Sequence, residues 1–175
     1  MSDNVILNYI ESRLADSAPE PAPVTTDRSL AKGLLAGLIG GLVATAAKSL
    51  AERVYPPRTH GEPEPPDVLV EHIAGHPLTG DSLTVATEAI HWTFGAAAGA
   101  AYGGLAEYYP AATARQGTNF GMTLMALTHE GALPALGLSA EPSDQTAREK
   151  TSEMASHVIF GFVAETVRAF VRSRL

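Results

Sequence analysis

The chain has 175 residues, of which 45% are hydrophobic and 18% charged, and its formal net charge is -7. This length predicts a single domain. The negative charge argues against a nucleic-acid partner, which would favour clustered lysine and arginine. The sequence contains no cysteine, which excludes disulfides, thiolate metal sites and thiol nucleophiles.

Residues 1–28 precede the first long apolar segment. Residues 4–14 have apolar side chains on one side of a helix, which predicts a short amphipathic helix. The following ADSAPEPAPVTTD is a proline-rich linker, for which we expect no regular structure. The first residues lack a basic leader followed by an apolar run, so we expect no cleavable signal peptide.

The first long helix is expected over about 30–55, and it ends where Pro56 and Pro57 follow. At helical period, small residues occupy one face of its first half, and two ionisable residues continue that face in its second half. Small residues spaced four apart allow close helix packing in a membrane. This face comprises Gly33, Gly37, Gly41, Lys48 and Glu52.

A polar, proline-rich segment, 56–81, follows and is expected to form an outer loop with a short helix over 67–74. The second long helix, about 82–109, repeats the glycine face, now with ionisable groups at both ends. Its face comprises Glu88, His91, Gly95, Gly99, Gly103 and Glu107. Aromatic residues near both ends are typical of membrane interfaces.

The third helix is expected over about 114–134 and the fourth over about 144–173. Together, the four helices make residues 29–175 one membrane domain. The third helix carries His129 near its end. The fourth carries Glu153 and His157 early, and Glu165 and Arg168 late. All four lie on the small-residue face of that helix.

We predict an all-α, polytopic membrane protein with four transmembrane helices in an antiparallel bundle. None of the four segments has the ~18–20 uninterrupted apolar residues of a simple span. The interruptions are histidines and glutamates on the small-residue faces, and charge is tolerated in a bilayer when it faces a bundle interior. The distribution of lysine and arginine predicts that both termini are cytoplasmic, with the protein in the bacterial inner membrane.

The alternating helix directions predict two polar clusters at different depths. The inner cluster comprises Glu107, Glu165 and Arg168. The outer cluster lies in the outer third of the bilayer, at the level of Glu88 and Glu130, and comprises Lys48, Glu52, His91, His129, Glu153 and His157.

Two interpretations of the outer cluster are open. Imidazole and carboxylate groups suit zinc or iron, and Glu88-x-x-His91 matches the helix motif of di-iron bundles. The other interpretation is a hydrogen-bonded network that keeps the helices in register, and we favour it. The sequence requires no cofactor. If a metal binds, the candidate ligands are His91, His129, His157 and Glu153.

Several motifs resemble the YagU-like family of bacterial inner-membrane proteins. They are GLLAGLIGGLVATAAKSLAERVYPPR, the isolated His91, Ala106-Glu107 shortly before a proline, His129, and SEMASHVIFGFVAETVRAFVRSR. The similarity extends over about residues 32–174. It implies a polytopic membrane protein with a part in acid tolerance. Glu88 and Glu130 do not belong to the family pattern, which weakens the di-iron interpretation.

Three functions follow as expectations. The first is a non-enzymatic membrane protein whose His/Glu cluster is linked to proton or acid response, or to the organisation of membrane complexes. The second is an accessory subunit of a larger membrane complex, for example a respiratory one. The third is a small membrane metalloenzyme. The expected partners are the lipid bilayer and other membrane subunits or further copies of this chain.

Overall fold

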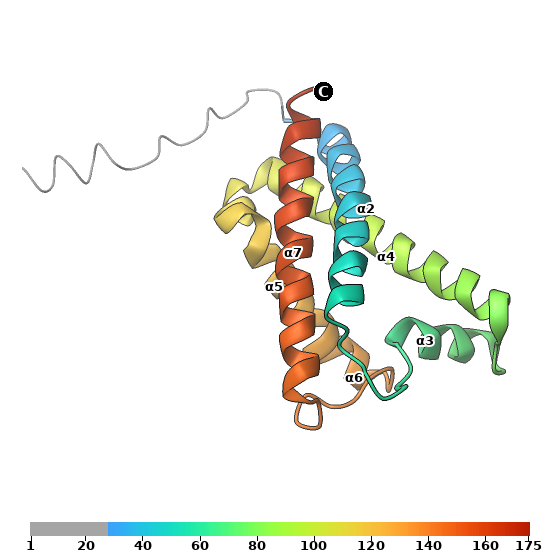
Figure 1. Cartoon of the computed structure of the whole chain (residues 1–175). Coiled ribbons are helices and arrows are strands. Elements are labelled where there is room, and N and C mark those ends of the chain that lie inside the picture. The colour runs from blue at the N-terminus through green and yellow to red at the C-terminus, as the bar shows by residue number, and fades with distance from the viewer. Residues whose placement is uncertain (1–27) are drawn as a thin grey trace, which may run out of the picture.

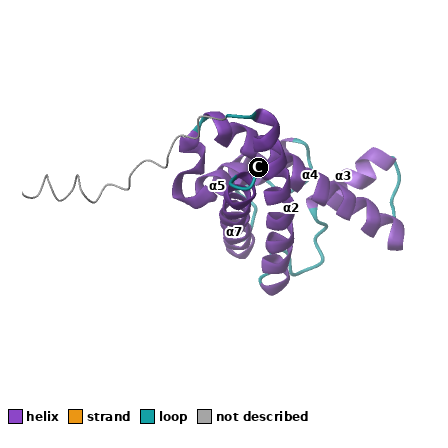
Figure 2. Ribbon diagram, turned by 90° about the horizontal axis from the view of Figure 1, so that it is seen from above, coloured by secondary structure: helices purple, strands orange, loops and turns teal. Residues whose placement is uncertain are grey.

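The structure is a computed structural model that describes residues 28–175, and all regular elements in this range are helical. The predicted helix at 4–14 and its linker lie outside the described residues. Helices α2 (Leu30–Val54), α4 (Gly80–Tyr108), α5 (Thr118–Leu127) and α7 (Ala147–Arg172) form the bundle. Helix α2 packs against both α4 and α7, and α5 packs against α7 (Figure 1). The short helix α3 (Pro65–Ala74) packs against α4, to one side of the other helices (Figure 2).

Helices α2 and α4 contact each other through their glycine backbones. A Cβ atom built at Gly99 would lie 2.5 Å from both the Gly37 carbonyl oxygen and the Gly41 Cα. Gly103 is equally close to Gly37, where the distance from a built Cβ to the Gly37 Cα would be 2.6 Å. Any side chain at these positions would therefore push the two helices apart. Gly33 and Gly95 extend the same contact at its two ends.

Helix α7 makes two further contacts of this kind. A Cβ atom at Gly161 would lie 2.8 Å from the Gly121 backbone nitrogen in α5. On its other side, α7 brings the Ala164 carbonyl oxygen within 2.6 Å of a Cβ built at Gly40 in α2. Gly40 does not belong to the glycine face that the sequence predicts. That face of α2 contacts α4, whereas Gly40 lies on a second face that contacts α7.

An aromatic stack fills the centre of the bundle and ties three helices together. The rings of Tyr102 and Phe120 are stacked with centroids 4.1 Å apart, and Phe120 contacts Phe160 at 6.1 Å. Tyr102 and Phe160 are both only 2% exposed. Since these residues come from α4, α5 and α7, the stack fixes the relative positions of helices that are distant in sequence.

The third predicted helix is not one continuous α-helix. Residues Pro110–Gly117 form a 3-10 segment, η1, in which Arg115 and Gln116 have left-handed backbone conformations. After α5, residues Thr128–Ala132 form a π-helical turn, η2, followed by the single turn α6 (Leu133–Ala135). Pro134 has no N–H to donate to the carbonyl of Glu130. The regular α-helical hydrogen bonds are therefore interrupted here.

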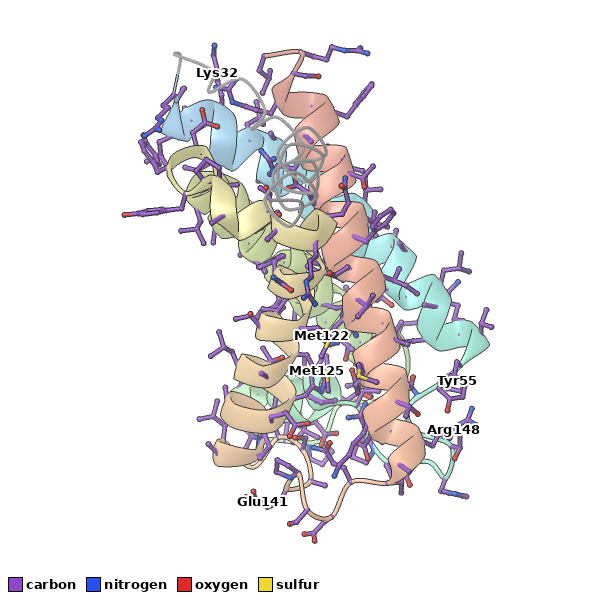
Figure 3. The ribbon with its side chains drawn as sticks, turned by 90° about the vertical axis from the view of Figure 1, so that its left-hand side faces the viewer. Lys32, Tyr55, Met122, Met125, Glu141 and Arg148 are labelled. Carbon is purple, nitrogen blue, oxygen red and sulfur yellow. The ribbon has the colours of Figure 1, made fainter. Side chains whose placement is uncertain are left out.

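The connection between α2 and α3 returns along the end of α7. Tyr55, directly after α2, stacks under the guanidinium of Arg148, which lies 4.5 Å from the ring centroid (Figure 3). Ser152 donates a hydrogen bond of 2.5 Å to the Tyr55 carbonyl oxygen. Thr146 caps α7 by accepting from the Glu149 backbone N–H at 3.1 Å. These contacts place the residues after Pro57 over the first turns of α7.

Within residues 28–175, two helices, α2 and α7, are long and apolar enough to cross a membrane by length and composition. The sequence-based expectation was four. Helix α4 falls short because several glycines together with His91 and Trp92 lower the hydropathy of its apolar stretch. Helix α5 falls short because it has only ten residues before the π-helical turn.

Replacing Gly99 by leucine is expected to destabilise the protein in detergent, because the side chain would occupy the space of the α2 backbone. We expect a loss of about 1–3 kcal/mol or more in unfolding free energy, measured by thermal or denaturant unfolding followed by circular dichroism. Ala97→Leu is the matched control, since Ala97 is exposed on the same helix. Equal stability of the two variants would contradict the close approach of α2 and α4.

Candidate functional site

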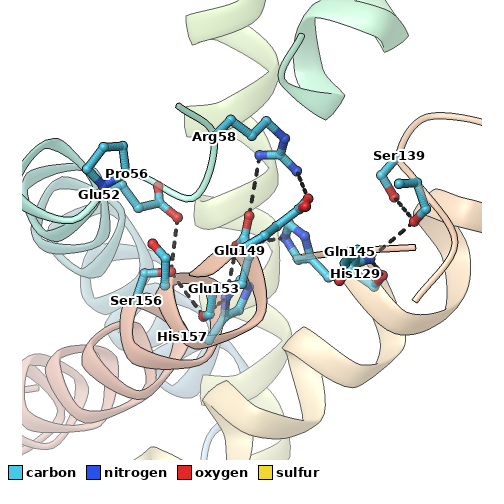
Figure 4. A network of polar contacts seen from close by, with 12 residues as sticks. Glu52, Pro56, Arg58, His129, Ser139, Gln145, Glu149, Glu153, Ser156 and His157 are labelled. Atoms are coloured by element: carbon cyan, nitrogen blue, oxygen red, sulfur yellow. Dashed lines mark hydrogen bonds and ion pairs between the residues drawn. The ribbon is translucent and has the colours of Figure 1, made fainter. Parts of the chain in front are cut away.

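Glu153 lies at the centre of the outer polar cluster, with only 3% of its side chain exposed. Its Oε1 lies 3.4 Å from Nη1 of Arg58. Its Oε2 lies 3.4 Å from Nε2 of His129, 3.7 Å from Nδ1 of His157 and 3.8 Å from Nζ of Lys48. Among the described residues, Oε2 has no hydrogen bond. One oxygen of a buried carboxylate is therefore surrounded by nitrogen atoms but not satisfied by them (Figure 4).

The cationic side of the cluster comes from the end of α2 and the segment after it. Lys48 forms an ion pair with Glu52 one turn further along α2. Ser156 of α7 donates to Glu52 Oε1 at 2.9 Å, which connects the two helices. Arg58 also pairs with Glu149, at 3.2 Å. The guanidinium therefore bridges two carboxylates one turn apart on α7.

The two histidines near Glu153 lie in different types of helix. His129 lies in the π-helical turn η2, and His157 lies in α7 directly opposite. Their ring centroids are 5.0 Å apart, with the rings nearly perpendicular. Nδ1 of His157 lies 2.8 Å from the backbone oxygen of Glu153, one turn earlier. Because a carbonyl oxygen only accepts, this nitrogen carries the proton and the ring is held in one orientation.

His91 occupies a different place from the other two predicted histidines. Its Nε2 lies 3.1 Å from the hydroxyl of Ser49, so α4 and α2 are joined by this hydrogen bond. His91 lines the same cavity as His129 and His157, and its hydrogen bond goes to Ser49 rather than to either of them. The structure therefore brings together Lys48, Glu52, His129, Glu153 and His157, with His91 on the cavity wall.

The two extra carboxylates at this level point elsewhere. Glu88 is exposed and accepts a hydrogen bond of 2.8 Å from the indole nitrogen of Trp92. Glu130 is also exposed. Glu88 and His91 thus do not form half of a di-iron site, and the Glu-x-x-His interpretation is not supported by the positions of their side chains.

A cavity of about 160 Å³ lies beside the cluster. The polar cluster forms one side, and apolar residues from α4, α5 and α7, including Phe94, Leu124 and Phe160, form the other. The polar groups at and around Glu153 include three carboxylates and two permanent cations that pair with them. The carboxylates are those of Glu52, Glu149 and Glu153, and the cations are Lys48 and Arg58. With both histidines neutral, the group carries one negative charge in excess.

The predicted inner cluster separates into two neighbouring ion pairs. Arg168 contacts Glu165 through two hydrogen bonds of 2.7 Å, and the Tyr102 hydroxyl donates to the same carboxylate at 2.7 Å. Glu107 is held instead by Arg172, at 2.6 Å, and by the backbone N–H of Ser29, at 2.8 Å. Glu107 therefore helps to anchor the start of α2.

Sequence reasoning missed several members of these networks. Arg58, in the segment expected to form an outer loop, and Arg172, near the end of the fourth expected helix, each pair with a buried carboxylate. Tyr102 and Ser156 were also missed. Helical period places Arg172 on the same face as Glu165, and Ser156 lies one turn after Glu153, but it does not show which residue of another helix each one contacts. The position of Arg58 depends on a loop path and has no such signal.

Replacing Arg168 by methionine is expected to destabilise the protein strongly, because the buried Glu165 carboxylate would lose the cation that pairs with it and keep the Tyr102 hydroxyl as a donor. The expected loss is about 3–5 kcal/mol of unfolding free energy, and adding Glu165→Gln should restore part of it. Arg53→Met serves as the control, since Arg53 is exposed. A double variant less stable than Arg168→Met would contradict the role of the Arg168–Glu165 ion pair in this prediction.

Comparison with known proteins places the chain in a family. A family model described as "Protein of unknown function (DUF1440)" matches residues 42–166. No curated protein and no solved structure matches the chain. The matched segment runs from the middle of α2 into α7 and contains Lys48, His129, Glu153 and His157. Since this segment covers more than half of the sequence, the chain belongs to the DUF1440 family.

Proposed function

We propose that this protein is an integral membrane protein of the bacterial inner membrane whose helix bundle encloses a His/Glu binding site and acts without catalysis. The observation that carries the proposal is the Glu153 carboxylate, 3% exposed and approached by charged or imidazole groups from three other segments. Burying ionisable groups is expensive, and within a membrane bundle they mark functional sites by default.

The packing of the helices supports four spans. Helices α2 and α7 have the composition of spanning helices. Helix α4 contacts α2 backbone to backbone, and α5 does the same with α7, so each is held at the depth of its partner. Of the ionisable side chains of α4, Asp81 and Glu88 lie in its first three turns, His91 lines the cavity and Glu107 pairs with Arg172. Close glycine contacts of this kind are typical of helix association in membranes.

The charges at the two ends support cytoplasmic termini. The end formed by the start of α2 and the finish of α7 carries Arg28, Lys32, Arg172 and Arg174, and η1 adds Arg115. The opposite end has Arg58, Arg148 and Lys150 among many carboxylates. Short cytoplasmic segments are richer in lysine and arginine, which supports a cytoplasmic position for the first end.

The chemistry of the cluster favours binding over catalysis. Carboxylate and imidazole groups bind cations, whereas Lys48 and Arg58 are already engaged with carboxylates. The part in acid tolerance comes from the YagU-like resemblance and stays a prediction. The alternatives of an accessory subunit and of a small metalloenzyme stay predictions as well.

Single cysteines at Gly61 and Ser173 are expected to react with a membrane-impermeant thiol reagent from opposite sides of the membrane. The natural chain has no cysteine, so there is no background labelling. Gly61 should be labelled in intact cells whose outer membrane has been permeabilised, and Ser173 only after lysis of the inner membrane. A cysteine at Thr113 should behave like that at Ser173.

Two results would contradict this topology. Labelling of Gly61 and Ser173 from the same side would show that the chain does not cross as proposed. Recovery of the protein in the soluble fraction without detergent would remove the membrane assignment altogether, whatever the His/Glu cluster binds.

A further inference from the structure

The outer cluster contains three metal-ligating side chains that lie close to one another. His129, Glu153 and His157 each offer one ligand atom, and these three atoms lie within 4.8 Å of one another. The distance between His129 Nε2 and Glu153 Oε2 is 3.4 Å. Two ligands bound at about 2.0–2.1 Å to a tetrahedral zinc ion lie about 3.4 Å apart, so this pair already has the spacing of zinc ligands.

A second, independent observation points to a missing cation. Glu153 Oε2 is buried, and among the described residues it has no hydrogen bond. The other oxygen of the same carboxylate faces Arg58. Buried polar atoms normally find a partner, and an orphaned one requires an explanation such as a bound ion. A metal ion between the imidazoles and Oε2 would supply it.

We propose that His129, Glu153 and His157 bind a divalent transition-metal ion of the zinc class. This inference rests on the proposed binding site and names its ligand. Two imidazoles and one carboxylate are the donors that such ions take in sites with an open fourth position. The neighbouring cavity of about 160 Å³ has room for a water molecule at that position. Hard cations such as Mg²⁺ prefer oxygen ligands.

The surroundings orient the ligands as in known metal sites. The Nδ1–H of His157 donates to the Glu153 backbone oxygen at 2.8 Å, which leaves Nε2 as its unprotonated nitrogen. Ligating histidines usually donate their other N–H to such a partner. The backbone oxygen of His129 accepts from the side-chain amide of Gln145 at 3.4 Å. The π-helical turn that carries His129 is an element frequently found at functional sites.

Lys48 and Arg58 both oppose a cation at this site, and Lys48 is the one that lies near Glu153 Oε2, the oxygen proposed as a ligand. The Nζ of Lys48 lies 3.8 Å from Glu153 Oε2, but it is also paired with Glu52. A positive charge this close weakens the binding of a divalent cation through Coulomb repulsion. Removing the charge while keeping the length of the side chain, as in Lys48→Met, should consequently tighten metal binding.

The test is equilibrium binding of Zn²⁺ to the full-length protein in detergent, purified with an affinity tag free of histidine and stripped with a chelator. We expect one Zn²⁺ per chain, Co²⁺ bound with the absorption bands of a tetrahedral site, and thermal stabilisation by either ion. His129→Gln, His157→Gln and Glu153→Gln should each weaken Zn²⁺ binding by about 100-fold or more, because loss even of a residue that only supports a ligand costs about 10–100-fold. Lys48→Met should tighten Zn²⁺ binding by about tenfold, which corresponds to 1.4 kcal/mol, because it removes the repelling charge.

His91→Gln is the matched control, because His91 lines the same cavity but lies outside the ligand set. Each variant is checked for folding by circular dichroism, and the cysteine labelling above is repeated on it. Absence of Zn²⁺ binding by the folded natural protein would overturn the metal inference and leave the membrane topology standing. So would undiminished binding by the folded His129→Gln/His157→Gln double variant, or a loss in His91→Gln equal to that in His157→Gln.

Discussion

The burial of one carboxylate governs the arrangement of the outer half of this molecule. With 3% of its side chain exposed, Glu153 has lost most of its hydration, and the lost solvation must be replaced by nearby charges and dipoles. They come from the end of α2, from the segment after it, from η2 and from α7 itself. No single helix can supply them. The carboxylate thus couples segments that are about one hundred residues apart in sequence.

Such a site requires helices that approach unusually closely, which is the structural role of the glycines. Backbone contact along Gly37, Gly41 and Gly99 joins α2 to α4, and Gly121 and Gly161 join α5 to α7. With side chains at these positions, the helices would separate and the polar groups would no longer meet. The inner ion pairs, Glu165 with Arg168 and Glu107 with Arg172, hold the opposite end of the bundle in the same register. The close packing of the helices and the pairing of the buried charges therefore depend on each other.

Helical periodicity in the sequence was enough to identify residues that share one face of a helix. It indicated the close glycines of α2 and α4 and the residues Lys48, Glu153 and His157, because each follows the small-residue face of its own helix. It could not find Arg58, whose position depends on a loop path, or the partner of His91, which depends on how α4 crosses α2. The π-helical turn at His129 was missed because it arises from a local change in hydrogen bonding, and the N-terminal segment lies outside the described residues.

The central claim is that the buried carboxylate of Glu153 is held by charges from other segments, and a double-mutant cycle between Arg58 and Glu153 tests it most directly. Unfolding free energies of the natural protein, Arg58→Gln, Glu153→Gln and the double variant would be measured in the same detergent. The account predicts a coupling energy of about 1–3 kcal/mol, since the two side chains are 3.4 Å apart and shielded from solvent. Additive effects of the two substitutions would show that the groups act independently and would contradict the account.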